Sequence, residues 1–237
     1  MVKKILIATI LFSIVVIVAI TAYEHGYLRF NYPNKKRYPI RGIDVSHHQG
    51  KVDWDLVKEE NLHFVFIKAT EGGDFKDTQF DRNWQEASRI GLIKGAYHFF
   101  TFCKPGIEQA RNFIDTVPVD NNDLPPVIDF EFSGNCSQRP TKTDLLKEFF
   151  NFANAVKARY GKSPIIYATY TSYKEYLEGE IDNYHVWIRD IFWTPELPNL
   201  KPWTFWQYTN RGRIKGIKGL VDLNVFAHKD MWKLKSI

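Results

Sequence analysis

One short stretch of the sequence, residues 125–132 (PPVIDFEF), limits the possible folds more than any other. Its valine, isoleucine and phenylalanine residues favour a β-strand, and the two prolines fix where that strand begins, because proline is tolerated at a strand start but not at its centre. Side chains alternate between the two faces of a strand, so Asp129 and Glu131 point the same way, with Cα atoms about 6.7 Å apart. A Ser-Gly-Asn sequence at 133–135 ends the strand, which places both acids at its carboxyl end.

Apolar residues flank the two acids on both faces of this strand, which indicates that the strand is covered on both sides. An edge strand with solvated acids is the alternative for any Asp-x-Glu pattern. Two buried carboxyl groups on one face repel each other, so we expect the pKa of one to rise and that of the other to stay low. Acid–base chemistry at a glycosidic bond requires such a difference.

Strand patterns alternate with helix patterns from residue 41 onward, and this alternation predicts a parallel sheet with right-handed crossovers. The expected strands are 41–46, 64–70, 92–100, 125–132, 164–169, 185–188, 204–208 and 220–223. The expected helices are a short one starting near 52, then 79–90, 105–117, 142–160 and 173–178, after which helical patterns fade. This α/β order, with eight strands in roughly 200 residues, predicts a single TIM-like barrel, and an open doubly wound sheet is the alternative.

Polar and aromatic residues fall at or near the carboxyl ends of the expected strands, which is where a barrel of this kind builds its site. Taken singly, each has a purely structural alternative, such as a turn residue for Asp44, a hydrogen-bonded core histidine for His98 and plain packing for Trp187. The candidates outside the acid-bearing strand are Asp44, Glu71, Tyr97, His98, Tyr167, Trp187, Gln207 and Asp222.

The N-terminal residues 1–22 combine Lys3 and Lys4 with an apolar stretch that begins at Ile5. This stretch is about 18 residues long, near the lower limit for spanning a bilayer and longer than the apolar part of most signal peptides. We expect a hydrophobic helix that acts as a signal-anchor and leaves the rest of the chain outside the cytoplasm, with a cleaved signal peptide as the alternative. Residues 23–40 are expected to form a short tether, followed by the barrel domain at 41–237.

The formal net charge of +5 favours anionic partners such as nucleic acid, acidic lipid or an anionic cell wall. The basic residues are scattered and no nucleic-acid motif is visible, so we expect no nucleic-acid partner and interpret the charge as a bias toward a wall or a membrane. His47, His48 and His98 lack the spacing of a metal site, so we expect neither a metal nor another cofactor.

Cys103 and Cys136 are the only cysteines, and each follows the end of a neighbouring expected strand at the same end of the barrel. Secretion would supply the oxidising compartment in which a disulfide forms. We therefore expect these two residues to be bonded to each other, with two free buried thiols as the alternative.

Six segments of the sequence form a distinctive set, at residues 42–54, 64–72, 95–100, 125–132, 164–168 and 205–226. Taken together, they resemble the glycoside hydrolase family 25 lysozymes, the N-acetylmuramidases of the Chalaropsis type. The resemblance implies a barrel of five β/α units followed by three strands. It also implies hydrolysis of the β-1,4 bond between N-acetylmuramic acid and N-acetylglucosamine in peptidoglycan, by a monomer whose partner is the glycan strand. A non-catalytic peptidoglycan-binding module or a membrane-tethered structural protein on the same barrel is the alternative.

The resemblance further implies that Glu131 is the general acid and Asp129 its partner carboxylate, with Asp44 and Asp222 completing the acidic floor of the cleft. The expected substrate-binding residues are Tyr97, His98, Tyr167, Trp187, Gln207 and Glu71. The sequence departs from the family at one place, because a small residue usually follows Trp-Ile, whereas residues 189–193 here read RDIFW. The loop beside one sugar subsite is therefore expected to differ.

Overall fold

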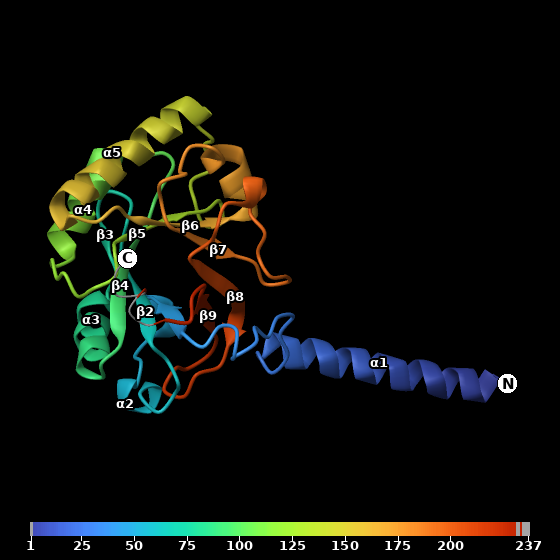
Figure 1. Ribbon diagram of the computed structural model, residues 1–237. Coiled ribbons are helices and arrows are strands. Elements are labelled where there is room, and N and C mark those ends of the chain that lie inside the picture. Colours follow the sequence, from blue (N-terminus) through green and yellow to red (C-terminus); the bar gives the residue numbers. More distant parts are fainter. Residues whose placement is uncertain (1, 231–232, 234–237) are drawn as a thin grey trace.

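A computed structural model describes residues 2–230 and 233 as a closed eight-stranded barrel with one short additional strand and an N-terminal helix (Figure 1). Strand β1 pairs with both β2 and β9, which closes the sheet, and β3 (Phe75–Lys76) pairs only with the end of β2. The predicted barrel is thus confirmed and the open sheet is excluded. The barrel strands are β1 (Arg41–Val45), β2 (Phe64–Glu71), β4 (Ile93–Phe99), β5 (Val127–Phe130), β6 (Ile165–Thr169), β7 (Val186–Arg189), β8 (Phe205–Gly212) and β9 (Val221–Phe226).

The last barrel strand runs against the other barrel strands. The pairs β1–β2, β2–β4 and each neighbouring pair from β4 to β8 are parallel, whereas β9 is antiparallel to both β8 and β1. The prediction of a parallel sheet is therefore confirmed for the other barrel strands and was wrong for β9. The physical reason is the short link at 213–220, which contains no helix, because a parallel return needs a crossover of a dozen or more residues.

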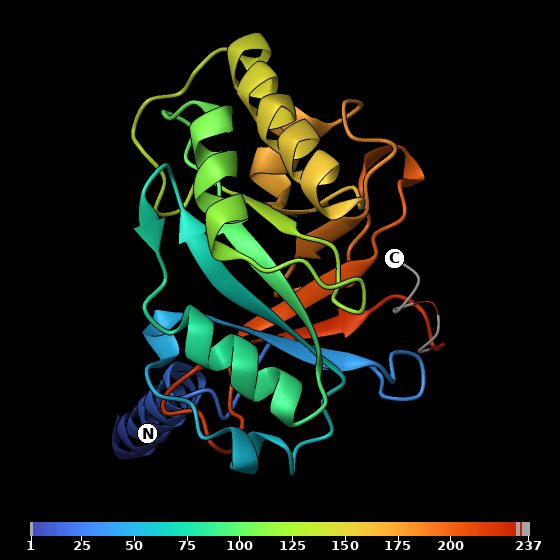
Figure 2. The same cartoon turned by 90° about the vertical axis from the view of Figure 1, so that its left-hand side faces the viewer.

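Helices cover the barrel unevenly. In Figures 1 and 2, α3, α4 and α5 lie outside the β2–β5 side, whereas the β8–β9 side carries no such layer. The α5 bounds match the expected helix at 142–160, because the Thr141 hydroxyl accepts a hydrogen bond from the Asp144 amide and Gly161 ends the helix with a φ of 71°. The helical segments of the barrel are η1 (His47–Gln49), α2 (Trp54–Val57), α3 (Phe80–Arg89), α4 (Gly106–Thr116), α5 (Lys142–Tyr160), α6 (Tyr170–Ser172), η2 (Tyr173–Leu177) and η3 (Pro198–Leu200).

The barrel interior is built from alternate residues of each strand. The deeper level is apolar, and its side chains form a cluster separate from the layer between barrel and helices. Gly42 and Gly95 leave the room that the rings of Phe64 and Phe66 need, since an added Cβ would lie 2.4 and 2.8 Å from those rings. The inner cluster includes Ile40, Phe64, Phe66, Val127, Ile165, Phe205 and Phe226.

The N-terminal helix α1 (Val2–Glu24) projects away from the barrel, and none of its residues is buried. It is the one helix, among the residues that the structure describes, that is long and apolar enough to cross a membrane by length and composition. The segment expected to be a tether is folded against the barrel. Tyr38 and Ile40 are buried, and the Arg41 guanidinium donates a hydrogen bond to the Pro33 carbonyl at 2.7 Å.

Candidate active site

Side chains from seven barrel strands enclose one cavity at the mouth of the barrel. They occupy the inward positions directly above the apolar interior, at the carboxyl ends of the parallel strands. Asp222 joins them from β9 because the antiparallel register sets it opposite Asp44. The eight residues that line the cavity were all among the candidates predicted from the sequence: Asp44, Tyr97, Asp129, Glu131, Tyr167, Trp187, Gln207 and Asp222.

His98 does not line this cavity. It follows the inward-facing Tyr97, and neighbouring residues of a strand point to opposite faces. Its ring is fully buried outside the barrel, stacked on Phe152 at 4.7 Å, and its nitrogens contact the Gln109 amide oxygen and the Thr70 hydroxyl. Burial lowers the pKa of His98 to about 3. His98 is therefore a hydrogen-bonded core histidine, the alternative considered above, and its position does not allow direct contact with a substrate in the cavity.

Glu71 also lies outside the cavity lining. Its carboxylate accepts a hydrogen bond from the Lys68 ammonium at 2.6 Å. The pairing of β2 with β4 shifts by one residue between Lys68 and Thr70, and such a bulge changes which face the following side chains occupy. Lys68 itself is buried and brings a positive charge near the acids, a feature that the strand pattern did not reveal.

Asp44 is held by a network of neutral donors. Its Oδ2 accepts hydrogen bonds from the Asn224 amide at 2.7 Å and from the Gln207 amide at 3.1 Å. Burial raises the pKa of Asp44, and these hydrogen bonds oppose the rise. Burial and the neighbouring Asp44 charge raise the pKa of Asp222 well above its ordinary value. The pKa therefore rises further at Asp222 than at Asp44, so Asp222 keeps its proton more readily.

The aromatic side chains of the cavity are fixed by the same network. The Tyr167 hydroxyl donates to the Gln207 amide oxygen at 3.0 Å, and the Trp187 indole donates to the Asn224 amide oxygen at 2.9 Å. Their rings meet edge to face, 4.7 Å apart. Asn224 was missed in the sequence, although its position two residues after Asp222 puts it on the same inward face of β9.

Asp129 and Glu131 form the second acidic pair. Burial and the neighbouring Glu131 charge raise the pKa of Asp129 well above its ordinary value. Burial raises the pKa of Glu131 from 4.5 to about 7, and the positive charges of Arg189 and Lys68 oppose that rise. The expectation that one acid keeps a low pKa was therefore wrong, because burial disfavours charge on both.

A carboxyl group with a pKa of about 7 is half protonated near neutral pH, so Glu131 can donate a proton to a leaving group. Asp129 offers a buried oxygen, Oδ1, that has no hydrogen-bond partner within residues 2–230 and 233. A bound substrate can supply that partner. Together the two acids provide a proton donor and an unsatisfied acceptor in one cavity.

Arg189 directly follows Trp187 and Ile188 and begins the stretch at which the sequence was expected to differ from the family. It alternates with Trp187 along β7, so it shares the inward face and lies one step nearer the mouth. Its charge reaches Asp44, Glu131 and Asp222 and lowers the pKa of each. Its inward position could have been predicted from the strand alternation.

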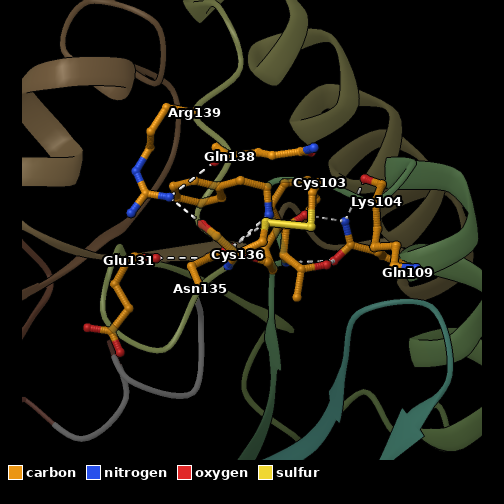
Figure 3. The surroundings of a disulfide bond; sticks show 11 residues. Cys103, Lys104, Gln109, Glu131, Asn135, Cys136, Gln138 and Arg139 are labelled. Atoms are coloured by element: carbon orange, nitrogen blue, oxygen red, sulfur yellow. Dashed lines mark hydrogen bonds between the residues drawn. A yellow bond between two sulfur atoms is a disulfide. The ribbon is translucent and has the colours of Figure 1, made fainter.

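The loop that carries Glu131 is fixed by the predicted disulfide between Cys103 and Cys136, which is confirmed (Figure 3). The Asn135 amide next to Cys136 donates hydrogen bonds to the carbonyls of Glu131 and Phe100, both at 2.9 Å. Figure 3 shows the Glu131 carboxylate pointing away from the sulfur atoms. The bond therefore supports the backbone of the acid without touching its carboxyl group.

Comparison with known proteins gives a consistent result. The model of the family "Glycosyl hydrolases family 25" matches residues 43–217. An uncharacterised Escherichia coli protein, YegX, is 39% identical over 194 residues, which cover 80% of this chain and 70% of that protein. Lysozyme M1 of Streptomyces globisporus is 36% identical over 201 residues, which cover 79% of this chain and 67% of that protein.

Solved structures agree with the sequence relatives. A family 25 glycosyl hydrolase from Bacillus anthracis superposes with a TM-score of 0.82 at 38% identity, covering 88% of this chain and 97% of that one. A bacterial lysozyme from Streptomyces coelicolor gives a TM-score of 0.76 at 34% identity, covering 83% and 95%. The resemblance expected from the sequence is thus confirmed: the chain belongs to glycosyl hydrolases family 25 and is a glycoside hydrolase.

Proposed function

We propose that this protein is a lysozyme (1,4-β-N-acetylmuramidase) that hydrolyses the β-1,4 bond between N-acetylmuramic acid and N-acetylglucosamine in peptidoglycan. In this proposal Glu131 is the general acid and Asp129 its partner carboxyl group. The observation that carries the proposal is the raised pKa of Glu131, about 7, in a cavity that it shares with Asp129. The names of the relatives, which include a lysozyme and N,O-diacetylmuramidases, support the substrate class.

The other cavity residues have roles that follow from their contacts. Asp44 and Asp222 lie opposite each other in the cavity, where they would support the charge and hydrogen bonding around the substrate. Tyr97, Tyr167 and Trp187 present amphipathic rings of the kind that pack on sugar faces. Gln207 connects the two groups, because its amide contacts both Asp44 and Tyr167.

A non-catalytic peptidoglycan-binding module on the same barrel is the main alternative. Binding alone gives no reason to bury four carboxyl groups around one cavity, because burial disfavours their charged forms. A proton donor poised near neutral pH is useful only if a bond is broken. The positions of Glu131 and Asp129 therefore favour hydrolysis over binding.

The location that we propose follows from α1. A helix of 23 residues whose most apolar 18-residue window has a mean hydropathy of 3.0 suits a signal-anchor that holds the barrel outside the cytoplasm, next to the wall. The disulfide fits an oxidising compartment of that kind. Cell fractionation tests this part, and a soluble product that starts near residue 22 would show cleavage instead.

The decisive experiment is mass spectrometry of purified peptidoglycan after digestion. We expect muropeptides with new reducing ends on N-acetylmuramic acid. Glu131→Gln should abolish their release, while Glu108→Gln, at an exposed position on α4, should not. Products with reducing ends on N-acetylglucosamine, or no products, would refute the proposed bond specificity or the activity respectively.

A further inference from the structure

An exposed aromatic and apolar surface lies where α1 meets the barrel. Phe192 and Trp193 come from the β7–β8 loop, and their side chains are 52% and 77% exposed. The other members come from the segment that follows α1, and all of them are exposed. We call this surface the aromatic collar, and it consists of Tyr27, Leu28, Phe30, Tyr32, Phe192 and Trp193.

The collar is continuous with α1. The Phe30 ring lies 4.8 Å from the ring of Tyr23, in the last turn of α1, and 5.0 Å from the ring of Phe192. The loop is built to present its aromatic residues, since the amides of Phe192 and Trp193 both donate to the Asp190 carboxylate at 2.9 Å.

The joint between α1 and the barrel is held by several contacts. The Arg211 guanidinium donates to the Glu24 carbonyl at 3.1 Å and lies over the Tyr23 ring, while Arg213 donates to the His25 carbonyl at 3.0 Å. Gly26 has a φ of +73°, and an added Cβ there would lie 2.7 Å from the Arg211 carbonyl oxygen. The position of the barrel relative to the end of α1 is therefore defined.

We propose that the aromatic collar sits in the outer headgroup region of a lipid bilayer, so that the barrel itself contacts the membrane that α1 crosses. Twenty-three helical residues span about 34 Å, which matches a hydrocarbon core of roughly 30 Å. A bilayer around α1 therefore ends near Tyr23, where the collar begins. Tyrosine and tryptophan prefer this interface, because one end of each ring system is apolar and the other is polar.

Basic side chains beside the collar fit the same partner. Arg29 lies over the Tyr32 ring at 4.9 Å and Arg213 over the Tyr27 ring at 4.6 Å, while Arg211 lies over Tyr23 in the adjoining last turn of α1. Guanidinium groups at this depth meet lipid phosphates, whose negative charge attracts them. The collar and these arginines together form an amphipathic edge that matches a membrane interface.

The proposal also orients the active site. Figure 1 looks along the barrel, and α1 leaves it sideways on the β8–β9 side. A helix that crosses the membrane in this position lays the barrel on its side, so that the cavity opens along the membrane surface. The enzyme would then reach glycan strands in the wall layer next to the membrane.

Fluorescence quenching by brominated lipids tests the proposal with the full chain. The protein is reconstituted in vesicles of phosphatidylcholine and phosphatidylglycerol whose acyl chains carry bromine close to the headgroup. Trp193→Phe should remove most of the lipid-dependent quenching and keep an apolar ring in the loop. The matched control is Ile107→Trp on α4, an exposed position on the side of the barrel away from α1, which should add emission that the lipid does not quench.

Two results would overturn the proposal. Equal quenching of the wild type and the Trp193→Phe variant would show that Trp193 lies away from lipid. Lipid-dependent quenching of the emission that Ile107→Trp adds would show that the barrel has no fixed membrane side. The readout needs no catalysis, so its outcome is independent of the proposed lysozyme activity.

Discussion

Glu131→Gln should make the protein more stable while it abolishes hydrolysis. In the folded chain, burial raises the pKa of Glu131 from 4.5 to about 7. The native state therefore holds a proton that the unfolded chain has already released, and stability is lost as pH rises from about 4.5 to about 7. At about 1.4 kcal/mol for each tenfold change in proton affinity, the full loss is roughly 3 kcal/mol. Glutamine has the same shape and never ionises.

The comparison is made by urea unfolding between about pH 4 and about pH 8. We expect the two proteins to have similar stability near pH 4, and the Glu131→Gln protein to be more stable by up to about 3 kcal/mol above pH 7. Because part of the Glu131 side chain reaches solvent, this figure is an upper estimate. The exposed-site control, Glu108→Gln, should leave the pH dependence unchanged.

Two results would refute the reasoning. If Glu131→Gln is destabilised above pH 7, the ionised carboxylate must be stabilised by contacts that outweigh its burial. If the variant keeps wild-type hydrolysis, another group donates the proton, because loss of a general acid typically costs about 10²–10⁴-fold in rate. Stability and activity are thus two separate measurements on one substitution.

Three further outcomes are expected. Arg189→Met removes a positive charge that lowers the pKa of Glu131, so the alkaline limb of the kcat/KM profile should move to higher pH, while Arg189→Lys should leave it nearly in place. Replacing Cys103 and Cys136 by serine removes a disulfide whose cysteines are 33 residues apart in the sequence, and it should lower the unfolding free energy by about 3–4 kcal/mol. An unchanged midpoint of urea unfolding, or two thiols titrated in the unfolded, unreduced wild type, would contradict this. Asn224→Leu removes the donor to Asp44 and the acceptor for the Trp187 indole, which should lower the free energy of unfolding in urea by about 1–3 kcal/mol. A variant that unfolds at the same urea concentration as the wild type would contradict this.

The alternation of side chains along strands explains most of what could be predicted. It placed Asp129 and Glu131 on one face, and it would have excluded His98 had the inward position of Tyr97 been used as a constraint. The closed barrel also followed from the order of strands and helices. These inferences depend on local backbone geometry, which the sequence determines directly.

Other features depend on pairing between distant segments. The antiparallel direction of β9 brings Asp222 and Asn224 to the mouth beside Asp44, and the residue pattern within β9 does not show that direction, which only the length of the preceding link indicates. The bulge between Lys68 and Thr70 likewise arises where two strands meet. The prediction that one of the paired acids keeps a low pKa was wrong for a related reason. The pKa of each acid depends on how deeply the closed barrel buries it, and the sequence does not show that depth.

The last prediction concerns which group attacks the sugar carbon. Because Asp129 and Glu131 come from alternate positions of one strand, we predict that their carboxyl groups are more than about 5.5 Å apart, wider than in a direct nucleophile pair. The acetamido group of N-acetylmuramic acid lies next to the reacting carbon, so it is already present at high effective concentration.

We therefore expect the substrate's own acetamide to attack, with Glu131 protonating the leaving oxygen. The unpartnered Oδ1 of Asp129 is placed to accept the acetamide N–H and to stabilise the ring that forms, while Asp44 and Asp222 support the charge around it. Two displacements at one carbon give retained stereochemistry, which NMR of the fresh anomeric product measures on a muropeptide substrate. Net inversion would exclude the acetamide route, and a trapped glycosyl ester on Asp129 would show that the carboxylate attacks directly.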